Sequence, residues 1–244
     1  MSLTEPPLAT TVVAHIDLLG YGTMLRAASG QLSHPVGALA CERIRAFHGV
    51  ERLQRPPSGV TVKKLNDAIV AVRDLDRDPE TGGIRQTLDS LRPLTLSARG
   101  AGEYWAFLEW TRDVHDDIRR SQRGAGYPGA RTVVVADERL ATPPDDDPLN
   151  LNMAFAAAYL ADHAGSRAGL GGDYLYVEWR AYSLVLGILR RLFPIAPSIA
   201  SDVDFLGSKL SFLRCIPKSS QPADGMPPSR TRDAVYVTDI AGSL

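Results

Sequence analysis

Two aspartates, Asp17 and Asp67, each lie where a strand-like apolar run breaks into a turn. Asp17 ends the run within VVAHIDLLGYGT (residues 12–23), and Asp67 lies in a tight turn of VTVKKLNDAIVAV (residues 60–72). The glycine-containing turn after Asp17 offers backbone N–H groups, and a nest of this kind binds phosphate oxygens. Two carboxylates on neighbouring strands beside such a nest indicate a site for a nucleotide and a divalent metal ion.

The composition indicates the class of protein that must position these side chains. The chain has 244 residues, of which 44% are hydrophobic and 23% charged, as in an ordinary soluble globular protein. We expect a single domain over residues 1–244, with its core at about 11–216 and a flexible Pro- and Ser-rich segment at 217–232. The net charge of −1 implies no surface for nucleic acid.

Nothing in the sequence indicates secretion or insertion into a membrane. The start, MSLTEPP, lacks the basic and apolar regions of a signal peptide. The most apolar later stretch, residues 182–199, is interrupted by two arginines and two prolines, so no transmembrane span is expected. The two cysteines, Cys41 and Cys215, give no disulfide framework. We therefore expect a cytoplasmic protein.

The order of expected elements predicts a fold. Apolar and β-branched runs predict strands, and stretches of helical periodicity predict the helices between them. The order is strand, helix, strand, strand, helix, strand, helix, strand, which is the α+β, ferredoxin-like βαββαβ arrangement. Strands are expected at residues 11–17, 60–73 (two, joined at Asn66-Asp67), 130–136, 174–178, 205–215 and 233–239, and helices from about 23 to 47 and at 88–120, 150–163 and 179–193.

The two aspartate motifs resemble those of the catalytic domain of class III nucleotidyl cyclases. The phrase HIDLLGYGT matches the F-x-D-I-x-G-F-T at the end of that family's first strand, and VKKLND matches its hairpin V-K-T-I-G-D. The resemblance covers about residues 12–178. It implies that Asp17, the Leu18 backbone carbonyl and Asp67 hold two Mn²⁺ or Mg²⁺ ions per site.

The resemblance implies a reaction and an assembly. A nucleoside triphosphate would be converted to a 3′,5′-cyclic monophosphate and pyrophosphate, with the backbone N–H groups of Leu19, Gly20 and Tyr21 receiving the β- and γ-phosphates. Lys63 falls at the position where the family's adenylate cyclases read the base. Because the family completes each site with the partner subunit, a homodimer is expected.

The chain also departs from that family. In that family, the last helix carries an asparagine followed four residues later by an arginine, and both stabilise the transition state. In LNLNMAFAAAY either Asn150 or Asn152 could be the asparagine, and alanine stands four residues after each. We prefer Asn152 for a ribose or phosphate contact, since Asn150 could equally cap the helix. Arg167, in the turn HAGSRAGLGG, is the candidate for the missing positive charge.

In these departures the chain resembles a divergent branch of the family, the stand-alone pyrimidine cyclases of bacterial Pycsar anti-phage systems. The matching phrases are IDLLGYG, the Asn-Asp hairpin turn and AAAYLAD. The resemblance implies UTP as the favoured substrate, CTP next, and a separate effector activated by the cyclic nucleotide. Two alternatives stay open: an adenylate or guanylate cyclase, and a degenerate cyclase fold that senses nucleotide.

Residues near the motifs have simpler interpretations too. His15 alternates with Asp17 onto one strand face, and a core histidine is the favoured interpretation. Lys64 lies on the opposite face from Lys63 and is expected at the surface. The acidic run at Asp145 is expected to be a solvated loop.

Overall fold

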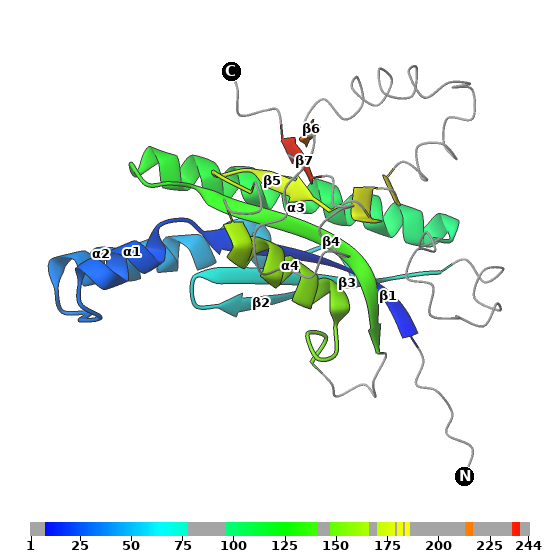
Figure 1. Cartoon of the computed structure of the whole chain (residues 1–244), viewed down its shortest axis with the longest axis horizontal. Coiled ribbons are helices and arrows are strands. Elements are labelled where there is room, and N and C mark those ends of the chain that lie inside the picture. Colours follow the sequence, from blue (N-terminus) through cyan, green and yellow to red (C-terminus); the bar gives the residue numbers. More distant parts are fainter. Residues whose placement is uncertain are drawn as a thin grey trace, which may run out of the picture.

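A computed structural model of the chain describes residues 8–77, 96–140, 147–165, 170–178, 180–182, 184–185, 213–216 and 236–239 (Figure 1). Within these ranges, no helix has both the length and the apolar character that crossing a membrane would require.

The core is built on strand β1 (Leu8–Leu18), a run rich in β-branched and apolar residues. β1 pairs antiparallel with β3 (Ala68–Leu75) on one side and with β4 (Ala130–Leu140) on the other. β2 (Thr61–Leu65) pairs antiparallel with the outer side of β3. The order β2-β3-β1-β4 is that of a ferredoxin-like βαββαβ core, so the fold predicted from the sequence is confirmed.

The sheet extends beyond this core on the β4 side. β4 pairs in parallel with β5 (Leu175–Val177), and β7 (Tyr236–Asp239) and then β6 (Leu213–Ile216) follow in antiparallel pairs. The full order is β2-β3-β1-β4-β5-β7-β6. The strands expected at residues 174–178, 205–215 and 233–239 are therefore present, although much of the second and part of the third lie outside the described residues.

Helices cover both faces of the sheet (Figure 1). One face packs against α2 (Pro35–His48) and the long α3 (Ala98–Gly124), and the other packs against α4 (Met153–Ala164). The short α1 (Tyr21–Ala27) and the 3₁₀ helix η1 (Glu51–Gln54) complete the connections from β1 to β2.

Alternation along β1 divides its side chains between these two cores. Ile16 and Leu18 belong to the core under α2 and α3, whereas Val13 belongs to the core under α4. Because successive side chains of a strand point to opposite faces, His15 and Asp17 lie on the α4 side. The covering helix α4 is thus the element that must accommodate the Asp17 carboxylate.

α3 begins later than the helix predicted from residue 88, and its first turn shows why. Ser97 is its N-cap and accepts a hydrogen bond from the Gly100 N–H at 3.0 Å. Gly100 lies so close to the backbone that a Cβ there would be 2.1 Å from the Asp76 carbonyl oxygen. The helix therefore begins at Ala98, later than the predicted residue 88, and residues 78–95 lie outside the described part of the chain.

Other expectations fall partly or wholly on residues that are not described. The helix expected at 179–193 is seen at residues 180–182 and 184–185. Of the acidic run at Asp145, only Asp147 lies within the described residues, and it is exposed, whereas the segment 217–232 lies outside them. Pro35 opens α2 at its first turn, as the missing N–H of proline favours.

Candidate functional site

Asp17 and Asp67 lie side by side at one end of the sheet. Asp17 pairs with Ala68 in the β1–β3 register, so Asp67 is one residue away from it across the ladder. The Leu18 N–H donates to the Asp67 carbonyl at 2.9 Å and ties the hairpin turn to the end of β1. The turn itself is made by Asn66, whose φ of 41° lies in the left-handed region that asparagine tolerates. The expected neighbourhood of the two aspartates is thus present.

The environment of Asp17 disfavours its charged form. Burial, with the nearby Asp162 carboxylate second, raises the pKa of Asp17 to about 7, against the opposing effect of Arg131, and Asp67 adds to the rise. A desolvated carboxylate crowded by other carboxylates gains from a nearby cation. A cation bound beside Asp17 would therefore favour its ionised form.

Arg131 and Asp162 are parts of this site that the sequence interpretation did not identify. Arg131 on β4 stands opposite Asp17 in the β1–β4 register. Its guanidinium donates from Nε to Asp162 Oδ1 at 2.6 Å and from Nη2 to the Asp162 carbonyl at 2.9 Å. Nη1 donates to the Leu170 carbonyl at 3.1 Å, and Nη2 lies 3.5 Å from Asp17 Oδ2. A buried Arg–Asp pair therefore adjoins the Asp17 carboxylate.

His15 borders the same cluster. It is 4% exposed, its Nδ1 lies 3.7 Å from Asp162 Oδ2, and its ring meets Tyr159 edge-to-face at 6.0 Å between centroids. Burial is the main reason why the pKa of His15 is lowered. Its burial agrees with the favoured interpretation of a satisfied core histidine, but its buried Nδ1 makes no hydrogen bond, so the ring is not fully satisfied.

The turn after Asp17 has one amide fewer for phosphate than predicted. The Leu19 N–H donates to the Gly129 carbonyl at 3.2 Å, so it is already paired in this structure, and Leu19 is left out of the cradle. Gly20 is the N-cap of α1 with φ 79°, a conformation that favours glycine, and Tyr21 begins the helix. The amides that open a helix have no carbonyl partner within it, so the predicted cradle narrows to Gly20 and Tyr21.

Arg43 of α2 holds this turn from behind. It is 3% exposed, and its Nη2 donates to the Leu19 carbonyl at 2.7 Å and to the Pro128 carbonyl at 2.8 Å. Its Nε donates to Gln122 Oε1 at 2.6 Å, and its guanidinium lies 4.8 Å from the centre of the Tyr127 ring. Three segments far apart in the sequence are joined by one side chain.

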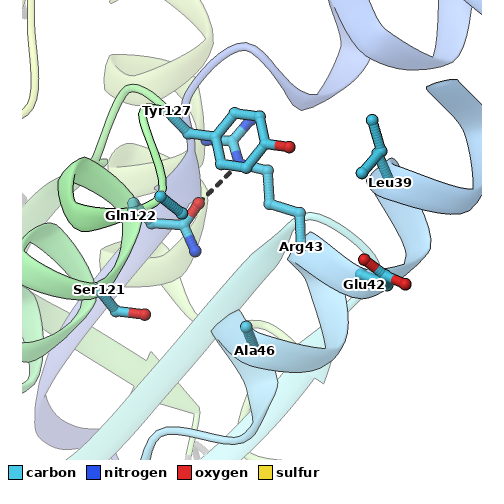
Figure 2. A pocket seen from close by; sticks show the side chains of 8 residues that line it. Leu39, Glu42, Arg43, Ala46, Ser121, Gln122 and Tyr127 are labelled. Carbon is cyan, nitrogen blue, oxygen red and sulfur yellow. Dashed lines mark hydrogen bonds between the residues drawn. The ribbon is translucent and has the colours of Figure 1, made fainter.

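A shallow pocket of about 280 Å³ lies against Arg43 between α2 and the end of α3 (Figure 2). Arg43, Gln122 and Tyr127 form one part of its lining, and Leu39, Glu42 and Ala46 of α2 form another. Neither Asp17 nor Asp67 belongs to its lining.

Lys63 is engaged elsewhere. Its Nζ lies 3.3 Å from Asp147 Oδ2, with the two side chains 39% and 43% exposed. Lys64 donates to the His48 carbonyl at 2.8 Å, on the other side of the hairpin, as the strand alternation predicts. The base-reading role of Lys63 stays a prediction.

Asn152 is the N-cap of α4 rather than an exposed ligand. Its Oδ1 accepts from the Phe155 N–H at 2.9 Å, its Nδ2 donates to the Pro148 carbonyl at 2.9 Å, and it is 4% exposed. It also bridges to Arg139, far along β4 from the residue that pairs with Asp17. The capping role considered for Asn150 therefore belongs to Asn152, and we leave Asn152 out of the proposed site. Arg167 lies outside the described residues.

The donor atoms present fit a hard divalent cation. Within the described residues, no group of three or more His, Cys, Asp or Glu side chains is placed to hold a metal. Two carboxylates, Asp17 and Asp67, with the neighbouring Leu18 carbonyl offer the oxygen donors that Mg²⁺ and Mn²⁺ prefer. Burial, with the Asp162 and Asp67 carboxylates adding to it, raises the pKa of Asp17, and a cation nearby would favour its ionised form.

No family model and no curated protein matches the chain. Solved structures similar to it include the guanylyl cyclase Cya2, with 12% identity, a TM-score of 0.48 and coverage of 98% of this chain and 95% of that one. The dimeric guanylyl cyclase domain of RhoGC from Blastocladiella emersonii has 11% identity, a TM-score of 0.41 and coverage of 98% of both chains. The guanylate cyclase domain of RhGC from Catenaria anguillulae, solved with GTP, has 9% identity, a TM-score of 0.45 and coverage of 96% and 97%. Because these identities and TM-scores are low, we infer function from the chain's own residues.

Proposed function

We propose that this protein is a nucleotidyl cyclase, which converts a nucleoside triphosphate into a 3′,5′-cyclic monophosphate and pyrophosphate. The observation that carries the proposal is that Asp17 and Asp67 lie next to each other, at the end of β1 and in the turn of the β2–β3 hairpin, within a ferredoxin-like core. The same two residues carry the motif resemblance to class III cyclases.

The site residues have distinct roles in this reaction. The substrate 3′-oxygen forms a bond to the α-phosphorus in line with the bond that breaks, and pyrophosphate leaves. Asp17 and Asp67 would hold the divalent ions, which lower the pKa of the 3′-hydroxyl and neutralise charge on the triphosphate. The amides of Gly20 and Tyr21 would receive phosphate oxygens, on a turn that Arg43 holds in place.

The proposed base is uracil, with cytosine second. Its support is the resemblance of IDLLGYG and AAAYLAD to the pyrimidine cyclases, which also motivates a separate effector and a role in defence against phage. A pyrimidine leaves space in a purine-sized pocket, and a large side chain such as Phe155 is a candidate to fill it, whereas Tyr21 is 5% exposed and packs in the core under α2 and α3. A donor such as Lys63 would favour the uracil C4 carbonyl over the cytosine amine.

We propose a homodimer as the working assembly. The outer face of α4 and the turn before it expose apolar side chains, with Leu151, Met153, Tyr159 and Leu160 between 44% and 64% exposed. Large apolar side chains exposed in this way favour contact with another protein surface. A second copy would also bring new side chains to a site that has no arginine on α4 at the position expected from the family.

The test is to incubate the purified protein with Mn²⁺ and each of ATP, GTP, CTP and UTP, and to identify products by mass spectrometry. Cyclic UMP as the main product is the expected result. Asp67→Asn should abolish it, whereas the matched control Asp74→Asn, farther along β3 in a pair with Arg139, should not. Cyclic AMP or GMP as the dominant product would replace the pyrimidine assignment with that of a purine cyclase.

A second candidate function is a nucleotide sensor that binds without turnover. The specific observation in its favour is that Asn152 is buried as a helix cap and alanine occupies the position four residues later. Nucleotide binding that requires Asp17, without a cyclic product from any of the four triphosphates, would establish the sensor in place of the cyclase.

A further inference from the structure

Asp17 has two possible partners of opposite charge, the proposed metal ions and the Arg131 guanidinium. An arginine fork can bind a carboxylate with two strong hydrogen bonds, and a carboxylate so engaged is a poor metal ligand. In this structure the Arg131–Asp17 contact is long, at 3.5 Å between Nη2 and Oδ2. Charge-assisted bonds are usually about 2.7–2.9 Å, so Arg131 has not closed on Asp17.

Asp162 explains why the contact stays long. It takes the two shorter bonds of the guanidinium, 2.6 Å from Nε to its Oδ1 and 2.9 Å from Nη2 to its carbonyl. The Leu170 carbonyl takes Nη1 at 3.1 Å. Asp162 is 7% exposed and lies on α4, and Arg131 lies on the sheet, so the docking of α4 sets this geometry.

We propose, on the basis of the proposed function, that Asp162 is a positioning residue for the metal site. It holds the Arg131 guanidinium back from Asp17, so that the Asp17 carboxylate is left available to a divalent cation. Without the Asp162 carboxylate, Arg131 would turn its fork to Asp17 and compete with the metal ion. Asp162 itself touches neither metal nor substrate.

The test measures binding of Mn²⁺ alone by the electron paramagnetic resonance signal of the free ion. Asp162→Asn should weaken the Asp17-dependent binding by about 10–100-fold, the usual effect of residues that orient metal ligands. The double variant Arg131→Gln/Asp162→Asn should recover most of that loss, because the competing cation is gone. This rescue separates restraint of Arg131 from a purely structural role.

Asp173→Asn is the control, because Asp173 is a second buried carboxylate held by arginine, with Arg119 at 3.3 Å and the exposed Arg123 at 2.8 Å, and its side chain is 12% exposed against 10% for Asp162. It should leave Mn²⁺ binding unchanged. Circular dichroism melting of each variant establishes that it is folded, and the double variant, which removes the charges of Arg131 and Asp162 together, keeps the test open if the single variant unfolds.

Three results would overturn the inference. They are wild-type Mn²⁺ affinity in a folded Asp162→Asn variant, a double variant as weak as the single one, and Mn²⁺ binding that Asp17→Asn does not reduce. Failure of the proposed function is a different result, namely the absence of cyclic product from a wild-type protein whose Mn²⁺ binding still follows this pattern.

Discussion

Asp17 and Arg131 face each other across the β1–β4 pairing, with 3.5 Å between the carboxylate Oδ2 and the guanidinium Nη2. They are 114 residues apart in the sequence. The contact puts a positive charge beside the most crowded carboxylate of the site and makes Asp17 part of a network rather than an isolated strand-end residue. The predictions below depend on which members of this network act on ligands and which act on the fold.

Replacing either site aspartate should remove activity without unfolding the protein. Asp17→Asn and Asp67→Asn each take away a proposed metal ligand, and we expect more than the roughly 10–100-fold loss that is usual for residues behind the ligands. Turnover of UTP with Mn²⁺ is the measurement, with Asp74→Asn as the control. Near-normal turnover by either variant would contradict the two-metal assignment.

Arg43→Ala should destabilise the turn that carries Gly20. The change leaves the Leu19 and Pro128 carbonyls and Gln122 without their buried donor, and each unsatisfied group costs about 1–3 kcal/mol. Urea unfolding should show a loss of several kcal/mol, and hydrogen exchange should rise at the end of β1.

The exposed Arg26→Ala is the control for that change, since Arg26 contacts Thr23 at the surface of α1 and should alter stability by less than about 0.5 kcal/mol. Equal stability of the Arg43 and Arg26 variants would mean that Arg43 does not hold the turn.

Acid should destabilise the fold through His115. This fully buried imidazole donates to or accepts from Thr132 Oγ1 at 2.9 Å, and burial, with Arg119 second, lowers the pKa of His115 to about 4 from 6.5. Between these values the unfolded chain binds a proton that the folded chain does not. His115 therefore lowers the free energy of unfolding as the pH drops from 6.5 to 4, by up to about 3 kcal/mol, whereas the raised pKa of Asp17 acts in the opposite direction over this range.

Urea unfolding between pH 7.5 and 4.5 measures this effect. His115→Gln should lose less free energy of unfolding than the wild type as the pH drops, while the exposed His163→Gln should follow the wild-type profile. A profile that His115→Gln leaves unchanged would assign the acid sensitivity to other groups.

Leu160→Asp should shift the protein from dimer to monomer. Leu160 is 55% exposed on the outer face of α4, where a charge would be buried in the proposed interface. Light scattering should give a mass near twice 26.4 kDa for the wild type and near 26.4 kDa for the variant. Leu32→Asp, at a site that is 59% exposed between α1 and α2, should stay dimeric. A fully active wild-type monomer would refute the homodimer.

The elements that depend on local sequence pattern could be predicted from the sequence. The apolar run before Asp17 and the Asn66-Asp67 turn predicted β1 and the β2–β3 hairpin because strand alternation and turn chemistry act over a few residues. The order of elements then predicted the sheet. Asp17 and Asp67 were found in the same way, since both follow directly from strand ends.

Contacts between segments far apart in the sequence could not be predicted from local pattern. Arg131 was read as one residue of an apolar strand, and Asp162 as part of a helix, because their pairing depends on how α4 docks. Asn152 is expected at the nucleotide from the sequence, but the fold makes it the N-cap of α4. Lys63 pairs with Asp147, and its contact with the base stays a prediction. The type of a polar side chain shows which bonds it can make, whereas the fold decides which partner it meets.

The long sequence separation within the site has a consequence for synthesis of the protein on the ribosome. β1 emerges first, but its two neighbours in the sheet come from residues 68–75 and 130–140, and α4 follows later still. Pairings of such long range form late in folding. A nascent chain that ends before Asp162 would hold Arg131 without its restraint. We expect the site to bind metal and nucleotide only once α4 has left the exit tunnel, so that unfinished chains are inactive.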